Sequence, residues 1–311
     1  MENITVLGAG GFIGTNLTLA LRKKAHLRII GHDPGHLVNV KSSLPFGTEL
    51  FVIDCSCDID FEQLTRNTDI LFHLVSTTRP ANSNLDIPRE LDENVVFTAK
   101  LLESCVKSGV KKVVFFSSGG TVYGVNSHFP LKEDSPMNPV SSYGVQKLAI
   151  EKLLYLYGQI HGLDYRIIRL SNPYGPYQCP DGQLGVVAAF IYRMLRGQKI
   201  EIYGDGSVVR DFIYIDDAIE GVIKISFSDC GYKIFNLGSG RGRSIKEVLE
   251  VIAKIVGKKP EVRYLPQRSM DVPVNYLDTE RYESCYGRLI KVGFEEGIRR
   301  TCDYIRKEYR L

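Results

Sequence analysis

Short apolar runs alternate with amphipathic segments over roughly the first half of the chain. The runs are rich in β-branched residues, which is typical of buried strands. They predict strands at Ile4–Leu7, Leu27–Gly31, Leu50–Ile53, Ile70–Leu74, Val113–Ser117 and Asp164–Leu170. The segments between them predict helices at Gly11–Lys23, Phe61–Arg66, Asn94–Ser108 and Ser142–His161. Apolar strands separated by helices predict a doubly wound α/β fold, in which helices cover both faces of a parallel sheet.

This alternation becomes looser after about Asn172, where Gly- and Pro-rich turns separate shorter elements. Helices are still predicted at Gln183–Gly197 and Ser244–Val256, and Ser244 with Glu247 forms a capping-box pattern at the start of the second. We therefore expect a larger domain at residues 1–171, with a returning segment near 206–237. Residues 172–311 are expected to form mainly a smaller C-terminal α/β domain.

The composition excludes several classes of protein. The chain has 311 residues, 44% of them hydrophobic and 24% charged, which is enough apolar surface for a large core and too much for a disordered chain. A net charge of +3 gives no indication of nucleic-acid binding, and no apolar stretch approaches the roughly 18 residues of a membrane span. No signal peptide is expected before the first strand, and seven scattered cysteines favour free thiols in a reducing cytoplasm over a disulfide framework or a metal site.

A glycine-rich turn follows the first predicted strand and precedes the first helix. Glycines at positions 8, 11 and 14 allow a tight turn, a close approach of the backbone to a pyrophosphate, and close helix–strand packing. The free N–H groups of the helix would favour phosphate oxygens. The turn therefore predicts a dinucleotide site formed by Gly8, Gly11, Phe12, Ile13 and Gly14, although the same glycines could form an ordinary strand–helix corner.

An acidic residue at the end of the second strand supports this interpretation. Asp33 stands 19 residues after Gly14, where a carboxylate would accept hydrogen bonds from an adenine ribose and repel a 2′-phosphate, so NAD is favoured over NADP. The alternative is an Asp that stabilises a turn. Asp54, with its neighbour Cys55, follows the third strand and is expected near the adenine, or in a turn.

Tyr143 and Lys147 lie four residues apart at the start of the predicted helix Ser142–His161, and so share one helical face. An unperturbed tyrosine, with a pKa near ~10, is a poor base at neutral pH. A neighbouring ammonium favours the phenolate and would bring the phenol into a useful range for acid–base catalysis. An amphipathic surface pair would give the same pattern.

Six motifs occur in order along the chain: Gly8-x-x-Gly11-x-x-Gly14, Asp33, Ser117-Ser118…Val122-Tyr123-Gly124, Tyr143-x-x-x-Lys147, Arg169…Asn172-Pro173-Tyr174-Gly175-Pro176 and Arg210-Asp211-Phe212-Ile213-Tyr214-Ile215-Asp216-Asp217. Across essentially its whole length the sequence resembles the extended short-chain dehydrogenase/reductases, and within them the NAD-dependent nucleotide-sugar epimerase/dehydratase group. The resemblance implies a Rossmann domain that binds NAD at 1–171, and a domain at 172–311 that mainly binds a nucleotide sugar. It also implies that Tyr143 is the catalytic acid–base, that Lys147 binds the nicotinamide ribose, and that the protein is a homodimer.

The resemblance implies further binding residues on both sides of the site. On the cofactor side these are Leu74, Ser76, Asn94, Ser117 and Leu170. On the side of the UDP-sugar substrate they are Thr78, Asn172, Gly185, Val186, Tyr203, Arg210, Arg268 and Asp271. An arginine suits this role because its planar fork binds phosphate oxygens with two hydrogen bonds. Asp211, Asp216 and Asp217 are expected to cap turns and a helix rather than to bind a metal, and His73 is expected to serve packing.

The sequence departs from the family at one catalytic position. Relatives usually carry a Ser or Thr four residues before the Tyr of the Val-Tyr-Gly motif, which here is Gly119. Thr121 would face the same side in an extended segment, so Thr121 or Ser118 is the predicted substitute, with a water molecule or a backbone group as the alternative.

The same segment distinguishes between reactions of the group. Dehydratases and decarboxylases of the group typically carry an acidic residue just after the hydroxyl position, whereas here no acid occurs until Glu133. The resemblance therefore favours a 4-epimerase of a UDP-hexose that works by transient oxidation at C4. A nucleotide-sugar lyase and a non-catalytic NAD(H) sensor remain the alternatives. The sequence leaves open whether C2 carries a hydroxyl or an N-acetyl group, and whether C6 is an alcohol or a carboxylate.

Overall fold

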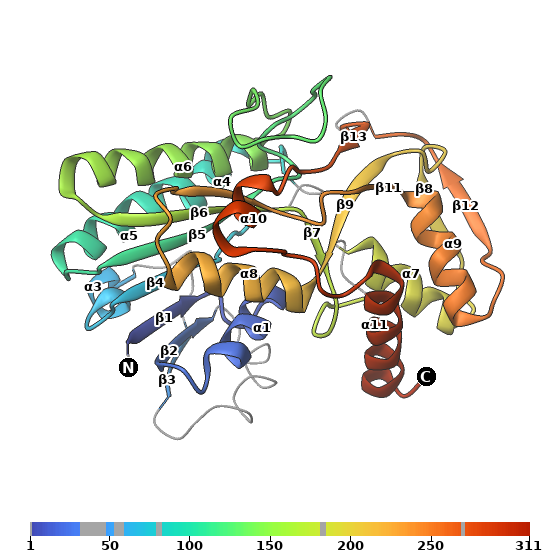
Figure 1. The fold of residues 1–311 in the computed structure, drawn as a ribbon, viewed down its shortest axis with the longest axis horizontal. Helices are drawn as coiled ribbons and strands as arrows, with labels where there is room; N and C mark the ends of the chain where they lie inside the picture. Colours follow the sequence, from blue (N-terminus) through green and yellow to red (C-terminus); the bar gives the residue numbers. More distant parts are fainter. Residues whose placement is uncertain (1, 32–47, 53–58, 79–82, 181–184, 269–270) are drawn as a thin grey trace. The chain divides into compact units, whose positions relative to one another are not determined.

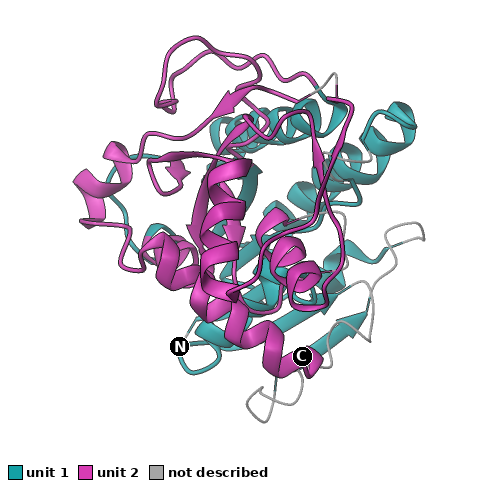
Figure 2. Ribbon diagram, turned by 90° about the vertical axis from the view of Figure 1, so that its right-hand side faces the viewer, with its two compact units in different colours: residues 1–117, 141–168, 225–234 teal, residues 118–140, 169–224, 235–311 magenta. Residues whose placement is uncertain are grey.

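The computed structural model describes residues 2–31, 48–52, 59–78, 83–180, 185–268 and 271–311. Three predicted cofactor residues, Asp33, Asp54 and Cys55, lie outside these ranges. The chain divides into two compact units, which Figure 2 shows in different colours. Unit 1 consists of Met1–Ser117, Ser141–Ile168 and Ile225–Ile234, and unit 2 of Ser118–Val140, Arg169–Lys224 and Phe235–Leu311.

Apart from the shift of one boundary from residue 171 to Ile168, the bounds of these units differ from the expected domains in two places. Residues 118–140 belong to unit 2, although the sequence pattern put them in the first domain. The returning segment of unit 1 is only Ile225–Ile234, shorter than the expected 206–237. Both differences arise from contacts between residues far apart in sequence, which local periodicity does not reveal. Which unit binds the cofactor and which the substrate stays a prediction.

Among the described residues the main sheet has seven strands in the order β10-β6-β5-β4-β1-β2-β3, and Figure 1 labels all of them except β10. Their bounds are β1 Asn3–Leu7, β2 His26–Gly31, β3 Glu49–Val52, β4 Ile70–His73, β5 Lys112–Ser118, β6 Asp164–Leu170 and β10 Ile234–Leu237. The fold is therefore the doubly wound α/β architecture that the sequence predicts. Strand order reverses between β1 and β4, which pair in parallel. Ligands of such sheets bind beyond the carboxyl ends of the strands at this reversal.

The helices of unit 1 contact this sheet or one another, and the one buried residue of α4 is Glu90. They are α1 Phe12–Leu21, α3 Phe61–Thr65, α4 Ile87–Leu91, a π-helical turn Asp92–Val96, α5 Phe97–Lys107 and α6 Ser142–His161. Leu101 of α5 and Leu154 of α6 are fully buried in one cluster with Val113 and Phe115 of β5. Helix α6 has the predicted bounds because Ser141 caps its first turn and Gly162, at φ 69°, ends it. The predicted helix Asn94–Ser108 instead begins as the π-helical turn.

Unit 2 combines short strands with four longer helices. Its elements are β7 Asn172–Tyr174, α7 Val186–Leu195, β8 Ile200–Tyr203, β9 Val209–Tyr214, α8 Ile215–Phe227 (whose last turn belongs to unit 1), β11 Gly242–Ser244, α9 Ile245–Val256, β12 Val262–Leu265, β13 Val274–Asn275, α10 Glu280–Tyr286 and α11 Phe294–Tyr309. Strand β9 pairs with β11, β13 and β7, and β12 pairs with β8. The capping box at Ser244 and Glu247 is present as predicted. None of the described helices has the length and apolar character needed to cross a bilayer.

The glycine-rich turn joins β1 to α1 and imposes two steric demands. Gly8 has φ +96°, a left-handed conformation that favours glycine. A Cβ on Gly14 would lie 2.1 Å from the carbonyl oxygen of Gly8 and 2.8 Å from the Cα of Ala9. By contrast, a Cβ on Gly11 would meet only the Gly8 oxygen at 3.5 Å, an ordinary contact. Packing of the protein therefore requires glycine at residues 8 and 14, but not at residue 11.

These contacts predict a loss of stability for one alanine substitution and little change for the other. Gly14→Ala should lower the free energy of unfolding by about 1–3 kcal/mol, because overpacking against backbone outweighs the better helix propensity of alanine. Gly11→Ala should change it by less than about 1 kcal/mol. Urea unfolding of the two variants beside the wild type measures the difference, and an equal loss in both would contradict the steric assignment.

Candidate active site

The turn between β1 and α1 is held by backbone hydrogen bonds from both neighbouring strands. Gly8 N and Ala9 N donate to Ile30 O at 2.8 and 3.0 Å, and Leu74 N donates to Leu7 O at 2.9 Å. Helix α1 has no side-chain cap at Gly11 and no acidic residue in its first turn. Exposed Gly11 has no Cβ to block a ligand there, so the first turn of α1 offers N–H groups and a positive helix end to a pyrophosphate. These residues fit the predicted dinucleotide.

Lys147 lies inside unit 1, with only 4% of its surface exposed. Its Nζ donates to Phe116 O at 2.9 Å and lies 4.8 Å from the ring centre of Phe115 and 5.6 Å from that of Tyr143. Burial lowers the pKa of Lys147 to about 8, and the charge of Glu151 partly opposes this shift. The structure therefore brings the two predicted catalytic residues together, with an ammonium beside a half-buried phenol.

The hydroxyl groups of two predicted cofactor residues form hydrogen bonds within unit 1. Ser117 Oγ donates to Glu151 Oε1 at 2.5 Å, and Ser76 Oγ donates to Thr78 O at 2.9 Å. The Thr78 hydroxyl, predicted to border the substrate, donates to Gln146 Oε1 at 3.0 Å. These three residues lie at the carboxyl ends of β4 and β5, and their hydroxyl groups are occupied by hydrogen bonds within the protein. Their contacts with ligands stay predictions.

Asn94 lies in the π-helical turn, and its side chain binds the loop after β4. Its Oδ1 accepts from Thr77 N at 2.9 Å, and its Nδ2 donates to Thr77 Oγ1 at 2.8 Å and to Glu90 O at 2.9 Å. The amide therefore holds the connection that follows Leu74 rather than projecting freely. Its predicted contact with the cofactor is not tested by this geometry.

His73 is buried among aromatic rings at the end of β4. Thr98 Oγ1 donates to Asn94 O at 2.6 Å, so at 2.9 Å from His73 Nε2 it accepts a hydrogen bond from the ring. Burial, with the charge of Lys147, lowers the pKa of His73 to about 3. The imidazole is therefore neutral and its Nε2 carries the proton, as suits the packing role expected of it.

In unit 2, the segment that should supply a catalytic hydroxyl is folded tightly. Gly119 N donates to Leu170 O at 2.9 Å, and Gly119 O accepts from Asn275 Nδ2 at 3.0 Å. A Cβ on Gly119 would lie 2.5 Å from Leu277 Cδ1 and 3.0 Å from Arg169 O. A serine at residue 119 would therefore point into the packed interior of unit 2. Packing accounts for the glycine at this position.

Thr121 and Ser118 lie on either side of Gly119 and Gly120. Thr121 N donates to Ser118 O at 3.2 Å, which closes a turn. Thr121 Oγ1 is buried and forms no hydrogen bond with any residue that the structure describes. A buried hydroxyl without a partner is costly, so a ligand atom that satisfied it would be favoured.

Tyr123, close to this segment, is excluded as the acid–base. Its hydroxyl donates to Asn236 Oδ1 at 2.5 Å and accepts from Arg169 Nη1 at 3.0 Å. Burial raises the pKa of Tyr123 to about 12, so the phenol keeps its proton. Arg169 also donates to Glu133 O at 2.8 Å and is only 1% exposed.

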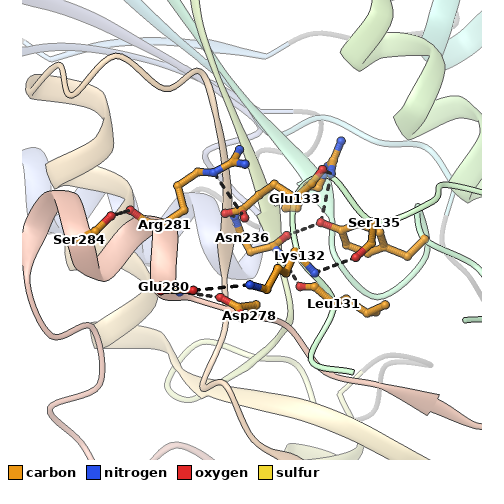
Figure 3. A network of polar contacts seen from close by, with 11 residues as sticks. Leu131, Lys132, Glu133, Ser135, Asn236, Asp278, Glu280, Arg281 and Ser284 are labelled. Carbon is orange, nitrogen blue, oxygen red and sulfur yellow. Dashed lines mark hydrogen bonds and ion pairs between the residues drawn. The ribbon is translucent and has the colours of Figure 1, made fainter. Parts of the chain in front are cut away.

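Figure 3 shows the network that continues from Glu133. Glu133 Oε1 accepts from Asn236 N at 2.9 Å, and Arg281 Nε lies 3.5 Å from Glu133 Oε2. Asn236 Nδ2 donates to Leu131 O at 2.8 Å. Burial raises the pKa of the Glu133 carboxyl. The sequence pattern does not predict this network, because its one local signal is Arg169, which precedes the Asn-Pro-Tyr-Gly-Pro motif.

Four of the predicted substrate residues form two pairs in unit 2. Arg210 Nη1 donates to Val209 O at 2.9 Å and Val272 O at 2.6 Å, and its Nη2 lies 4.0 Å from Asp271 Oδ1. The guanidinium of Arg268 lies 3.6 Å from the ring centre of Tyr203. One arginine is thus held by carbonyl groups and the other is stacked on an aromatic ring.

The remaining predicted substrate residues lie on β7 and at the start of α7. Asn172 Nδ2 donates to Asp211 O at 2.9 Å, and Gly185, at φ 92°, precedes Val186 at the start of α7. Asp211 is fully buried and accepts from Ser239 N and Oγ, both at 2.7 Å, so it caps a turn. Within the described ranges, no three His, Cys, Asp or Glu side chains gather as metal ligands do.

Comparison with known proteins places the chain in a family. The family model described as "NAD dependent epimerase/dehydratase family" matches residues 4–238. A UDP-glucose 4-epimerase of Mycolicibacterium smegmatis is 35% identical over 308 residues, covering 97% of this chain and 98% of that protein.

Two solved structures share the fold over almost their whole length. The UDP-glucose 4-epimerase of Thermotoga maritima, solved with UDP-glucose, has a TM-score of 0.92 and 32% identity, with 99% of both chains covered. The UDP-glucuronic acid 4-epimerase of Bacillus cereus, solved with UDP-glucuronic acid and NAD, has a TM-score of 0.90 and 28% identity, with 99% of this chain and 100% of that chain covered. The ordered motifs, the doubly wound sheet and these similarities lead to one conclusion: the chain belongs to the NAD dependent epimerase/dehydratase family.

Proposed function

We propose that this protein is an NAD-dependent 4-epimerase of a UDP-sugar. The observation that carries the proposal is the buried ammonium of Lys147 beside the ring of Tyr143, in the same unit as the dinucleotide turn. The relatives that act on C4 of UDP-glucose and UDP-glucuronic acid support it. Bound NAD supplies a reversible hydride acceptor, so that C4 is oxidised and reduced again with no net redox change.

Tyr143 moves the proton in this proposal. Its phenolate oxygen takes the proton of the C4 hydroxyl, and the phenol returns a proton when the ketone is reduced. The Lys147 ammonium stabilises the phenolate by its charge, and the low polarity around it strengthens that attraction. Because Lys147 is held by Phe116 O, its position does not depend on the substrate.

Thr121 is proposed as the second hydroxyl of the site. The family's usual position, Gly119, faces Leu277 and Arg169 O, whereas Thr121 Oγ1 lacks a protein partner among the described residues. Ser118 is the alternative, on the other side of the same turn.

Recognition of the UDP group is proposed for the arginine pairs of unit 2. Arg268 stacked on Tyr203 offers a charged edge and an aromatic face, which suits a phosphate next to a base. Arg210 is oriented by two carbonyl groups. Neither pair distinguishes among hexose, N-acetyl and uronic acid forms, so a panel of UDP-sugars followed by NMR is the experiment that identifies the substrate.

A lyase is the competing function, and Glu133 bears on it. Dehydration needs an acid that can protonate the leaving hydroxyl. Both carboxylate oxygens of Glu133 are engaged, one by Asn236 N and the other by Arg281 (Figure 3). Glu133, the first acidic residue after the Gly119–Thr121 segment, is therefore held in structural contacts rather than placed to protonate a leaving group. This supports epimerisation. Loss of water or carbon dioxide from a UDP-sugar in the NMR panel would favour the lyase.

We propose a cytoplasmic location, as the free thiols expected from the sequence favour. We also propose that the protein assembles as a homodimer. On α6, Leu156 is 46% exposed and Ile160 63% exposed, and Val96, which directly precedes α5, is 42% exposed. Helices α5 and α6 pack side by side in unit 1, so they offer apolar side chains for a second copy.

Replacing Tyr143 tests the acid–base assignment. Tyr143→Phe should lower turnover of UDP-galactose to UDP-glucose, or of whichever pair the panel identifies, at least about a hundredfold, because general acid–base catalysis is lost. Its thermal midpoint should stay unchanged. The matched control is Tyr264→Phe on exposed β12, which should keep full activity. Activity in Tyr143→Phe equal to that of the control would refute the mechanism.

The hydroxyl on the Gly119 segment is tested by two variants, each of which removes one hydroxyl group. Thr121→Val should lower turnover about tenfold or more if its hydroxyl contacts the sugar, and should not destabilise the fold, because that hydroxyl has no hydrogen bond to lose among the described residues. Ser118→Ala should have the smaller effect. The reverse order of rates would assign the role to Ser118.

A charged substitution on the exposed face of α6 tests whether the protein is a dimer. Ile160→Glu should convert a dimer into a monomer in light scattering after size exclusion, because a carboxylate buried without a partner is costly. Lys254→Glu, a charge reversal on the exposed surface of α9 in unit 2, is the control. A monomeric wild type at micromolar concentration would contradict the proposed assembly.

A further inference from the structure

Glu90, in α4, is a buried carboxylate whose partners all come from the surroundings of Tyr143. It is 6% exposed. Its Oε2 accepts from Ser142 Oγ at 2.6 Å and from Gln146 Nε2 at 3.0 Å, and its Oε1 accepts from Asn84 N at 3.0 Å. Ser142 and Gln146 directly precede Tyr143 and Lys147 along α6. The carboxylate therefore holds the flank of the helix beside the reactive pair.

Asn84 makes the second connection to α6. Its Oδ1 accepts from Ser142 N at 2.7 Å, and this N–H belongs to the first turn of the helix, where backbone donors have no partner within the helix. Asn84 has φ 81°, a left-handed conformation that costs energy outside glycine and persists only where contacts enforce it. Ser141 Oγ accepts from Gly144 N at 3.2 Å in the same turn. Two side chains thus cap the turn that carries Tyr143, one of them from 58 residues away.

Gln146 extends the network to the loop after β4. Its Nε2 donates to Ser142 Oγ at 2.8 Å as well as to Glu90, while its Oε1 accepts from Thr78 Oγ1. Every polar atom of the Gln146 side chain is therefore used, and the residue is 1% exposed. The contacts resist both rotation and sliding of the first two turns of α6.

The geometry shows why such restraint matters. A tyrosine hydroxyl stands about 8–9 Å from its helix axis, so a rotation of α6 by about 10° would move it by about 1.5 Å. A misplacement of about 1 Å can cost about a hundredfold in rate. Capping by Ser141 alone satisfies one N–H and does not fix the rotation.

We propose that Asn84 and Glu90 are positioning residues, which set the rotation of α6 and hence the place of the Tyr143 hydroxyl through Ser142 and Gln146. Neither residue takes part in proton transfer. This inference rests on the proposed epimerase function.

Asn84→Gly is the sharpest test, because glycine accepts φ 81° without strain while the Oδ1 acceptor is lost. We expect kcat for interconversion of the UDP-sugar pair to fall about tenfold or more, with KM within about twofold of wild type. Amide hydrogen exchange in residues 142–146 should become several-fold faster. Asn84→Asp keeps the acceptor and should restore kcat to within about threefold.

Asn67→Gly is the matched control, since Asn67 is an exposed asparagine with φ 54° in unit 1. It should leave kcat and the exchange of α6 unchanged. Should Asn84→Gly fail to fold, Ser142→Ala takes its place, with Ser142→Thr as the conservative rescue. Wild-type kcat in Asn84→Gly, unchanged exchange in α6, or no rescue by Asn84→Asp would overturn the positioning role. A wild-type protein that interconverts no UDP-sugar pair would instead refute the proposed function.

Discussion

Burial of the Lys147 ammonium is the constraint on which the arrangement of unit 1 depends. A cation removed from water needs compensating partners, and here Phe116 O accepts a hydrogen bond from Lys147 Nζ at 2.9 Å, while Glu151 lies one turn further along α6. Glu151 is itself bound by Ser117 of β5. These contacts join the carboxyl end of β5 to successive turns of α6. The register between strand and helix is therefore set by polar contacts inside an otherwise apolar interface.

Much of the fold could be predicted because the signals are local. The apolar strands, the bounds of α6 and the capping box at Ser244 each depend on residues close together in sequence. No strand after Leu170 was predicted: β7, β11 and β13 have three residues or fewer, too few to show a period, and the longer β8, β9, β10 and β12 were missed as well. The π-helical turn was predicted as ordinary helix because its apolar pattern is nearly the same.

The candidate site was less predictable, and Gly119 shows why. Comparison of motifs identifies a missing hydroxyl, but it does not tell which way a side chain at that position would point. That depends on Leu277 and on Asn275, which is 156 residues away in the chain. Asn84 and Glu90 were missed for the same reason, because neither carries a local motif and both act through contacts with a helix more than fifty residues later.

Each of the two units stabilises a buried charged side chain by a network of polar contacts. Glu90 in unit 1 and Arg169 in unit 2 are buried charged side chains, and each is bound by several polar groups from different segments of its unit. Such networks stabilise a fold less than apolar packing would, but they specify one arrangement, because any shift leaves a buried polar group unpaired.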